Sequence, residues 1–274
     1  MELCDSHCHI QSIGADKGDP GVKDKWAKAG ITDPDEVIAR AAKASVAKLI
    51  CVGCNLADSQ QAVDFVSGRD NCWASIGIHP HEASNYVNNA ADRERLQALV
   101  TSAKVLAIGE CGLDYFYMHS PKADQQAILR FQIELAIKSD LPLIFHVREA
   151  FDDFWTIFES YQSSQSPIHG VLHSFTDSQA NLERAIGHGL FIGVNGIATF
   201  TKELAQAEIY RTIPAEFLLL ETDAPFLTPV PFRGSICEPY HILTIAEHLA
   251  SARNVPLASI AEATNGNALK LLGI

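Results

Sequence analysis

The feature that most constrains the fold is a series of apolar runs, roughly 30 residues apart, most of which end at or just before a polar residue. The eight runs cover approximately residues 2–10, 48–53, 72–78, 104–109, 141–147, 168–173, 189–194 and 216–221. Most are continuous rather than alternating in polarity, which is typical of parallel strands buried on both faces. Strands that each deliver a last polar residue to one point are how a parallel barrel builds a site.

Segments with a helical spacing of apolar residues separate these runs. The clearest covers residues 121–139, with Ser120 as the expected N-cap, Pro121 at the first helical position and Pro142 preventing extension. Further helices are expected at residues 34–47, 57–67, 92–103, 148–161, 177–187, 241–253 and 257–272. The longest irregular stretches, 11–30 and 228–239, are interpreted as loops over a site.

Strand and helix alternate along the whole chain, which predicts an α/β fold with a parallel sheet. We expect a (β/α)₈ TIM barrel forming a single domain over residues 1–274, because polar residues end strands throughout the sequence. A doubly wound sheet is the alternative, but its ligands usually collect at one switch point. No repeat, low-complexity tract or linker indicates a second domain.

Composition narrows the class of protein. Hydrophobic residues make up 47% of the chain and charged residues 20%, as in ordinary globular proteins. No apolar run reaches the length of about 18 residues that a membrane helix requires. No secretory signal precedes the first run, so a cytoplasmic or nuclear location is expected. Seven cysteines without such a signal indicate reduced thiols. Cys51 and Cys54, a lone CxxC pair, are interpreted as small buried residues.

The net charge indicates how the chain could meet nucleic acid. Lys and Arg number 21 and Asp and Glu 33, so 21 − 33 gives −12. Proteins that bind nucleic acid tightly and without sequence preference usually carry a basic face. The acidic balance is against such binding. It leaves a nuclease open, because bound metals neutralise a phosphate locally.

Six residues at the ends of the runs form a candidate metal-binding set. His7 and His9 lie two apart, so on a strand both side chains point to one face. Glu110 is costly after an apolar run unless paired or coordinated, and we expect it to bridge two ions, with the flanking glycines letting the backbone approach a ligand. Asp223 can bind one ion and accept a proton from water. The full set is His7, His9, Glu110, His146, His173 and Asp223, whose nitrogen and oxygen donors suit two divalent metals.

Other polar residues near the run ends are candidate substrate contacts. His79 and His81 are assigned to a phosphate contact, a loop hydrogen bond or metal ligation. Arg148 and Arg233 suit bidentate phosphate binding, with an ion pair to a neighbouring Glu as the alternative. Asn195 is expected to orient a substrate, as is Asn55.

Asp114 and the residues that follow it allow more than one interpretation. Asp114 is a candidate substrate contact, although a helix N-cap or a loop contact explains it equally well. Tyr115, Phe116 and Tyr117 could stack on a base or pack over the barrel mouth. The remaining histidines are expected to be structural or solvent-facing; they are His119, His169, His188 and His248.

The chain resembles the TatD family of metal-dependent deoxyribonucleases, within the amidohydrolase-type barrels. Six segments carry the resemblance, in family order: Asp5-Ser6-His7-Cys8-His9, Gly77-Ile78-His79-Pro80-His81, Gly109-Glu110-Cys111-Gly112-Leu113-Asp114-Tyr115, His146-Val147-Arg148-Glu149-Ala150, His173-Ser174-Phe175 and Leu220-Glu221-Thr222-Asp223-Ala224-Pro225. The resemblance implies that one ion is held by His7, His9, Glu110 and Asp223, and the other by Glu110, His146 and His173.

The resemblance also implies an activity. Family members typically hydrolyse phosphodiester bonds as magnesium-dependent 3′-to-5′ exonucleases on DNA, and some similar proteins have been assigned D-aminoacyl-tRNA deacylase activity. This chain departs from the family in two places. Cys111 replaces a common isoleucine, and Ser235, Ile236 and Cys237 stand where basic residues are common. The second departure lowers the expected affinity for a long nucleic acid.

These observations lead to the hypothesis of a two-metal hydrolase that cleaves phosphodiester bonds. A hydroxide held by the metals would attack phosphorus in line, with Asp223 orienting it or accepting its proton. The cofactors would be two divalent ions, Mg²⁺ or Mn²⁺, with Zn²⁺ also compatible. The partner would be DNA, single-stranded or at 3′ ends, as a transient substrate; no membrane and no obligate protein partner is indicated.

Two other classes remain as alternatives. One is a hydrolase of esters, including a D-aminoacyl-tRNA ester, or of another small substrate at the same site. Related barrels that cleave such bonds often bridge their metals with a modified lysine from strand four, where this chain has Glu110; Lys104 lies at the wrong end of that run. The other is a non-catalytic metal-binding or nucleic-acid-binding module, which has no need of a proton-accepting Asp223.

Overall fold

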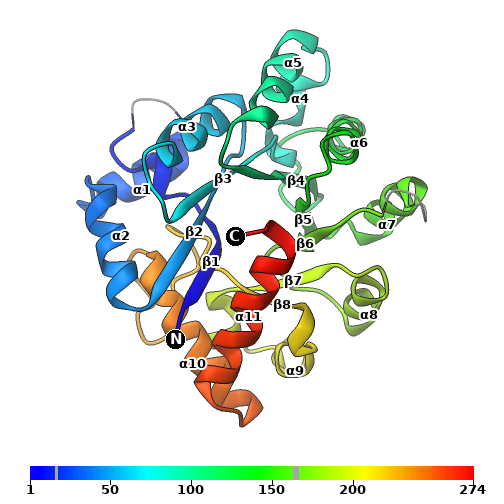
Figure 1. Cartoon of the computed structure of the whole chain (residues 1–274). Coiled ribbons are helices and arrows are strands. Elements are labelled where there is room, and N and C mark those ends of the chain that lie inside the picture. The colour runs from blue at the N-terminus through cyan, green and yellow to red at the C-terminus, as the bar shows by residue number, and fades with distance from the viewer. Residues whose placement is uncertain (16–17, 163–166) are drawn as a thin grey trace.

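A computed structural model shows eight parallel strands in a closed barrel, with helices outside (Figure 1). It describes residues 1–15, 18–162 and 167–274. The strands pair in chain order: β1 Leu3–Cys8, β2 Val46–Val52, β3 Cys72–Ile76, β4 Val105–Asp114, β5 Leu143–Arg148, β6 Gly170–Leu172, β7 Phe191–Val194 and β8 Leu218–Leu220. The predicted (β/α)₈ TIM barrel is confirmed.

The barrel closes between β8 and β1 through hydrogen bonds made by residues at the ends of these strands and directly after them. Ser6 Oγ donates to the Leu220 carbonyl, and the Asp223 amide donates to the His7 carbonyl at 2.8 Å. The His9 amide in turn donates to the Ala224 carbonyl at 2.8 Å. The seam therefore fixes His7, His9 and Asp223 relative to one another.

Helices cover the outside of the barrel (Figure 1). The described α-helices are α1 Pro20–Lys28, α2 Pro34–Lys43, α3 Leu56–Val66, α4 Ala83–Tyr86, α5 Ala90–Ala98, α6 Lys122–Ser139, α7 Phe151–Tyr161, α8 Gln179–Gly187, α9 Leu204–Thr212, α10 Ile242–Arg253 and α11 Leu257–Leu272. Short 3₁₀ turns join several of them, including η1 Ile10–Ser12 and η6 Pro239–His241.

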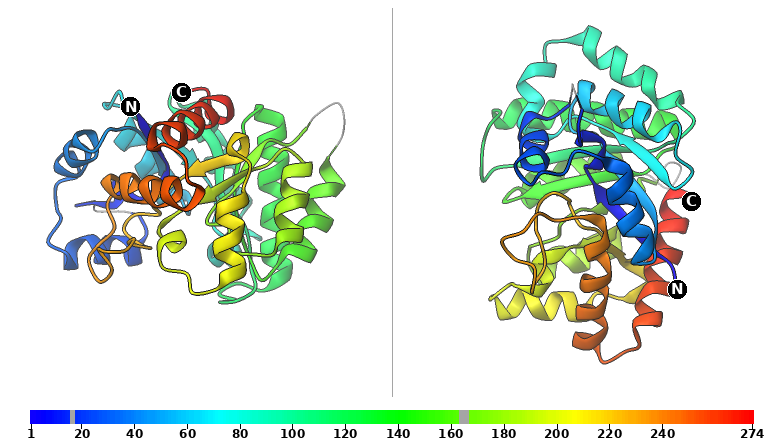
Figure 2. Two further views of the ribbon diagram at one scale, coloured as in Figure 1. Left: turned by 90° about the horizontal axis from the view of Figure 1, so that it is seen from below. Right: turned by 90° about the vertical axis from the view of Figure 1, so that its left-hand side faces the viewer.

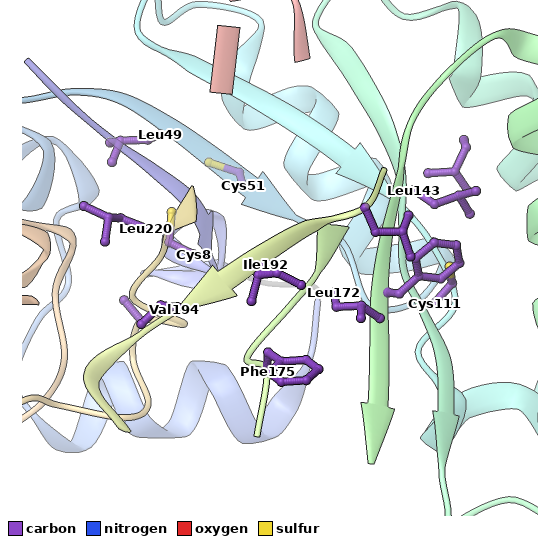
Figure 3. Packing of buried hydrophobic residues seen from close by; sticks show 14 of the residues in the cluster. Cys8, Leu49, Cys51, Cys111, Leu143, Leu172, Phe175, Ile192, Val194 and Leu220 are labelled. Carbon is purple, nitrogen blue, oxygen red and sulfur yellow. The ribbon is translucent and has the colours of Figure 1, made fainter. Parts of the chain in front are cut away.

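Two apolar cores follow from the alternation of side chains along the strands. The larger lies between strands and helices; Leu49, Cys51, Leu143 and Leu220 belong to it (Figure 3). The smaller fills the barrel, with Ile50, Val52, Ala107, Ile144, Val171 and Leu219 as members. Neighbouring residues such as Leu49 and Ile50 thus serve opposite faces, as a buried parallel strand requires.

The last helix, α11, crosses the end of the barrel at which the strands begin (Figure 1). Its Ala268 and Leu272 are buried in the interior core. Both termini lie at this same end, whereas α1 and the loop after β8 lie at the opposite end (Figure 2). The carboxyl ends of the strands are therefore the open end of the barrel.

Several predicted bounds were wrong, and the sequence shows why. The stretch 11–30 contains helix α1, whose N-cap Asp19 accepts from the Val22 amide, with Pro20 at the first helical position. Helix α9 was also missed. The helix predicted at 34–47 ends at Lys43, because Val46 already belongs to β2. Ser120 does not cap α6: its hydroxyl donates to the His81 carbonyl.

Strands β1 and β4 are irregular at the point where they carry the candidate ligands His7 and Glu110. The pairing of β1 with β2 shifts register between Asp5 and Cys8, and that of β4 with β5 shifts between Ile108 and Cys111. Ile108 and Cys111 consequently both pack in the outer core, although they are three residues apart. Bulges of this kind re-aim side chains next to active sites, and here they turn His7 and Glu110 inward.

Candidate metal centre

Six side chains from five segments of the chain converge at the open end of the barrel. His7 lies in β1 and His9 directly follows it; Glu110 lies within β4 and His146 within β5. His173 follows β6 and Asp223 follows β8. This is the set that the sequence predicts as metal ligands. Which of them bind an ion remains a prediction.

Glu110 lies at the middle of the group. Its Oε2 atom is 3.4 Å from His7 Nε2. Its Oε1 atom is 2.9 Å from His146 Nδ1 and 3.8 Å from His173 Nε2. The two oxygens of one carboxylate thus face two different groups of imidazoles, as a carboxylate shared by two cations would.

Asp223 completes the group around His7. Its Oδ1 atom lies 3.4 Å from His9 Nε2 and 3.8 Å from His7 Nε2. Asp223 has φ 58°, a left-handed conformation that Asp and Asn adopt more readily than most residues. Together with Glu110 Oε2, these atoms enclose one set of nitrogen and oxygen donors.

A second contact fixes the orientation of three of the four imidazoles. His9 Nδ1 lies 2.9 Å from the Val52 carbonyl, and His146 Nε2 lies 3.1 Å from Asp114 Oδ2. His173 Nδ1 lies 2.9 Å from Glu221 Oε1. In each ring the other nitrogen faces the centre. Such partners orient metal-binding histidines and raise their basicity.

Glu221 is the residue that sequence reasoning missed. It is fully buried, and its Oε1 atom also accepts from the Ser174 amide at 2.6 Å. The sequence predicts it only as the last residue of an apolar run. The cost of burying a carboxylate there is the one feature that indicates a functional role. Asp114 has a similar role, because its Oδ2 atom contacts both His146 and His81 at 3.1 Å.

This environment shifts the pKa values of the imidazoles in different directions. Burial lowers the pKa of His9, but the hydrogen bond and charge of Asp223 outweigh it and raise the pKa to about 9. The same balance raises the pKa of His146 to about 9, through Asp114 and Glu110, and that of His173 to about 9, through Glu221. Burial and the neighbouring His173 hold the pKa of His7 below its usual value.

His7 provides the test of whether a cation fits. Its ring is fully buried, and neither nitrogen has a hydrogen-bond partner among the described residues. It stacks on His173 with ring centroids 3.6 Å apart. A buried polar atom without a partner costs about 1–3 kcal/mol, so this neutral imidazole is suited to donating a lone pair to a metal. The residues present therefore fit a divalent cation.

A cavity of about 770 Å³ opens above the centre. His79, His81 and Arg148 line it, so the structure brings these three predicted substrate contacts to the site. His79 Nε2 is 3.6 Å from Glu110 Oε1, which makes it a neighbour of the ligand set as well. The other lining residues include Asp19, Lys25, Cys54, Tyr117, Ser174, Ile197, Phe226 and Leu227.

Four other predicted substrate contacts lie outside the cavity lining. Asp114 is buried beneath His81 and His146 and is absent from the cavity lining. Asn195 is buried, and its amide donates to Ser174 Oγ at 2.8 Å, so it supports the site from behind. Arg233 donates to the Thr228 carbonyl and lies over the Phe200 ring, outside the lining. Asn55 caps helix α3.

The structure corrects two smaller expectations. Cys51 is buried as predicted, but Cys54 is only partly buried and lines the cavity, with its Sγ 3.7 Å from Glu110 Oε2. The glycines around Glu110 serve strand packing: a Cβ at Gly112, where φ is 149°, would lie 1.8 Å from the His146 carbonyl oxygen. They bring β4 close to β5, and through it Glu110 close to His146.

Comparison with known proteins decides the family. The model of the family described as TatD related DNase matches residues 4–273. The chain belongs to the TatD family. The YabD protein of Bacillus subtilis, named as an uncharacterized metal-dependent hydrolase, is 33% identical over 99% of this chain and 99% of its own. The Escherichia coli K12 protein named 3′-5′ ssDNA/RNA exonuclease TatD is 35% identical over 88% of this chain and 94% of its own.

Solved structures agree with this membership. The crystal structure of YJJV, a TatD homologue from Escherichia coli, superposes with a TM-score of 0.84 at 28% identity, covering 99% of this chain and 98% of that chain. This TatD-family chain is therefore a metal-dependent hydrolase acting on ester bonds. Among its described residues, no helix is both long and apolar enough to cross a membrane.

Proposed function

We propose that this TatD-family hydrolase cleaves phosphodiester bonds from the 3′ ends of single-stranded nucleic acid, with DNA as the expected substrate. The observation that carries the proposal is Glu110, which faces two groups of imidazoles beneath an open cavity of about 770 Å³. Relatives named as 3′-5′ ssDNA/RNA exonucleases, at up to 36% identity, support the choice of substrate.

Different residues would bind the metals, accept a proton and hold the phosphate. His7, His9, Glu110 and Asp223 would hold one divalent cation, and Glu110, His146 and His173 the other. When bound, the two cations lower the pKa of water and neutralise charge on a phosphate. Asp223 borders the cavity and would accept a proton from the attacking water. His79, His81 and Arg148 would hold the phosphate oxygens.

We propose that both cations are Mg²⁺ or both are Mn²⁺. The carboxylates of Glu110 and Asp223 supply the oxygen donors that these ions prefer. The imidazoles also suit Zn²⁺, so occupancy depends on which ion is available.

Cleavage of end-labelled oligonucleotides tests the proposal. Single-stranded DNA labelled at either end is incubated with the enzyme in Mg²⁺, Mn²⁺ or EDTA. We expect a ladder shortening from the 3′ end that EDTA abolishes. The Glu110→Ala variant should lose at least about 100-fold in rate while keeping its fold, because it removes the donor common to both groups. The matched control is Glu203→Ala, at an exposed carboxylate outside the cavity lining.

Other outcomes would redirect the proposal. Near-full activity of Glu110→Ala with metal still bound would contradict the assignment of Glu110. An absence of cleavage by the metal-loaded enzyme would move the proposal to an ester at the same site, such as a D-aminoacyl-tRNA.

A further inference from the structure

We infer that Phe116, Tyr117 and the guanidinium of Arg148 form a stacking subsite for a nucleobase of the substrate strand, beside the metal centre. The three side chains are called the aromatic shelf. The inference rests on the proposed function and deepens it, because it assigns recognition of the strand to particular side chains.

The shelf is a pair of exposed rings held against one cation. Phe116 and Tyr117 are 50% and 51% exposed, and their ring centroids lie 4.8 Å apart, edge to face. The Arg148 guanidinium carbon lies 4.1 Å from the Phe116 centroid and 4.8 Å from that of Tyr117. Arg148 has no ion pair and no side-chain hydrogen bond with any described residue. Its cation is thus free to meet a base or a phosphate.

Neighbouring aromatic residues show that the exposure is particular to these two. Tyr115 is only partly buried, but its hydroxyl donates to Asp153 Oδ2 at 2.7 Å and Lys122 lies over its ring. It is anchored to helices α6 and α7. Phe116 has no polar group, and the Tyr117 ring stacks on that of His119, with centroids 5.8 Å apart, yet both rings stay about half exposed. Large rings left exposed at the mouth of a site are the arrangement that single-strand binding uses, since every base has a face that can stack.

One carboxylate fixes the position of the aromatic shelf relative to the metal centre. Asp114 Oδ1 accepts from the Phe116 and Tyr117 amides at 3.1 and 2.9 Å, while Oδ2 contacts His146 and His81. The backbone that carries the rings is therefore tied to the same group that orients a candidate metal ligand. Tyr117 and Arg148 also line the cavity above Glu110.

Contacts between rings trace the path from the shelf to the centre. The Tyr117 ring lies 5.6 Å from that of His81, and the His81 ring lies 4.3 Å from that of His79. His79 Nε2 is 3.6 Å from Glu110 Oε1. A strand whose last phosphodiester lies beside Glu110 would bring a neighbouring base onto the shelf. This gives the acidic chain an affinity for single strands that does not depend on a basic face.

Strands that lack one base test the inference without altering the protein. In single-stranded DNA, an abasic residue replaces each nucleotide near the 3′ end in turn. For one position we expect KM to rise about tenfold, which corresponds to about 1.4 kcal/mol, with a smaller change in kcat. RNA should show the same position dependence, because the rings contact the base and not the sugar.

The double variant Phe116→Ala, Tyr117→Ala is combined with the intact and abasic strands in a double-mutant cycle. Its KM for the intact strand should rise about tenfold, and removing the base should then cost nothing further. Tyr117→Phe keeps the ring and should stay sensitive to the abasic position. Leu204→Ala, at an exposed apolar residue outside the lining, controls for loss of exposed apolar surface. An equal abasic penalty in the wild type and the double variant would overturn the inference.

A binding signal separates this inference from the proposed function. 2-Aminopurine at the sensitive position, or at each position in turn if no strand is cleaved, should lose fluorescence on mixing with the metal-loaded enzyme, and less so with the double variant. Quenching without cleavage would reject the exonuclease and keep the shelf. Cleavage with neither quenching nor an abasic penalty would reject the shelf and keep the exonuclease.

Discussion

At the scale of single residues, the site depends on side chains that never reach the cavity. Glu221 and Asp114 are both buried, and each holds one imidazole by the nitrogen that points away from Glu110. A ring held at one nitrogen has only one tautomer and one orientation to offer at the other. Removing such a partner should loosen a ligand without removing it.

Glu221→Gln should weaken metal binding about 10- to 100-fold, because it removes the negative charge beside His173 Nδ1 while retaining an oxygen for the Ser174 amide. Titration of the metal-free protein with Mn²⁺ in a calorimeter measures the affinity. Glu203→Gln changes the same group at an exposed position and should bind as the wild type does. Equal affinities for all three proteins would show that Glu221 does not support the site.

At the scale of strands, the close contact between β4 and β5 sets the distance from Glu110 to His146. The backbones approach so closely at Gly112 that no side chain fits between them. The register shift between Ile108 and Cys111 lies just before this glycine. The two irregularities together direct Glu110 into the barrel.

Gly112→Ala should destabilise the protein by about 2–4 kcal/mol, since its Cβ would meet the His146 carbonyl and its φ of 149° disfavours any side chain. Urea unfolding measures the loss, and Mn²⁺ titration should show weaker binding as His146 moves. Gly266→Ala is the matched control: it lies in α11 with open space around it and should gain about 0.5–1 kcal/mol. A Gly112→Ala protein as stable as the wild type would refute this account of the strand contact.

Much of the barrel was predictable, because apolar runs and polar run ends are local signals. The ligand candidates were found for the same reason. The sequence predicts less well which face of the sheet each side chain points to. The bulges in β1 and β4 interrupt the alternation of side chains, and no residue pattern in the sequence indicates them. Arg233 and Asn195 were assigned to the substrate by residue type alone. Their hydrogen-bond partners are Thr228 and Ser174. These contacts depend on the conformation of loops, which local sequence patterns do not predict.

At the scale of the whole molecule, the two ends of the barrel have separate tasks. The open end gathers buried carboxylates and imidazoles, which is costly in the absence of a cation. The opposite end is apolar, and α11 covers it. Stability should therefore be limited by ionisable groups at and around the open end, such as those in the chain segment that leads from β8 to α10.

His241 should make stability depend on pH. Burial lowers its pKa to about 4 from the ordinary value of about 6.5, and the Glu238 amide donates to its Nδ1 atom at 3.0 Å. The unfolded chain therefore binds a proton more readily than the folded one. The contribution of His241 is complete above pH 6.5 and is lost as pH falls from 6.5 through about 4.

His241→Gln keeps an acceptor for the Glu238 amide and removes the titration. Between about pH 6.5 and 4 the wild type should lose about 1–2 kcal/mol more than this variant, allowing for partial solvent screening. Urea unfolding across that pH range measures the difference. Parallel pH profiles for the two proteins would show that His241 stays neutral or is already solvated.

The position of α11 also bears on how the chain is made. Ala268 and Leu272 complete a core whose other members include residues of β1, so the barrel interior stays open to water until α11 has been synthesised and packed. A nascent chain on the ribosome would expose the apolar inner faces of its strands until α11 has emerged. Such a chain is a natural client for chaperones, and the candidate metal centre at the far end would become rigid only once α11 has packed.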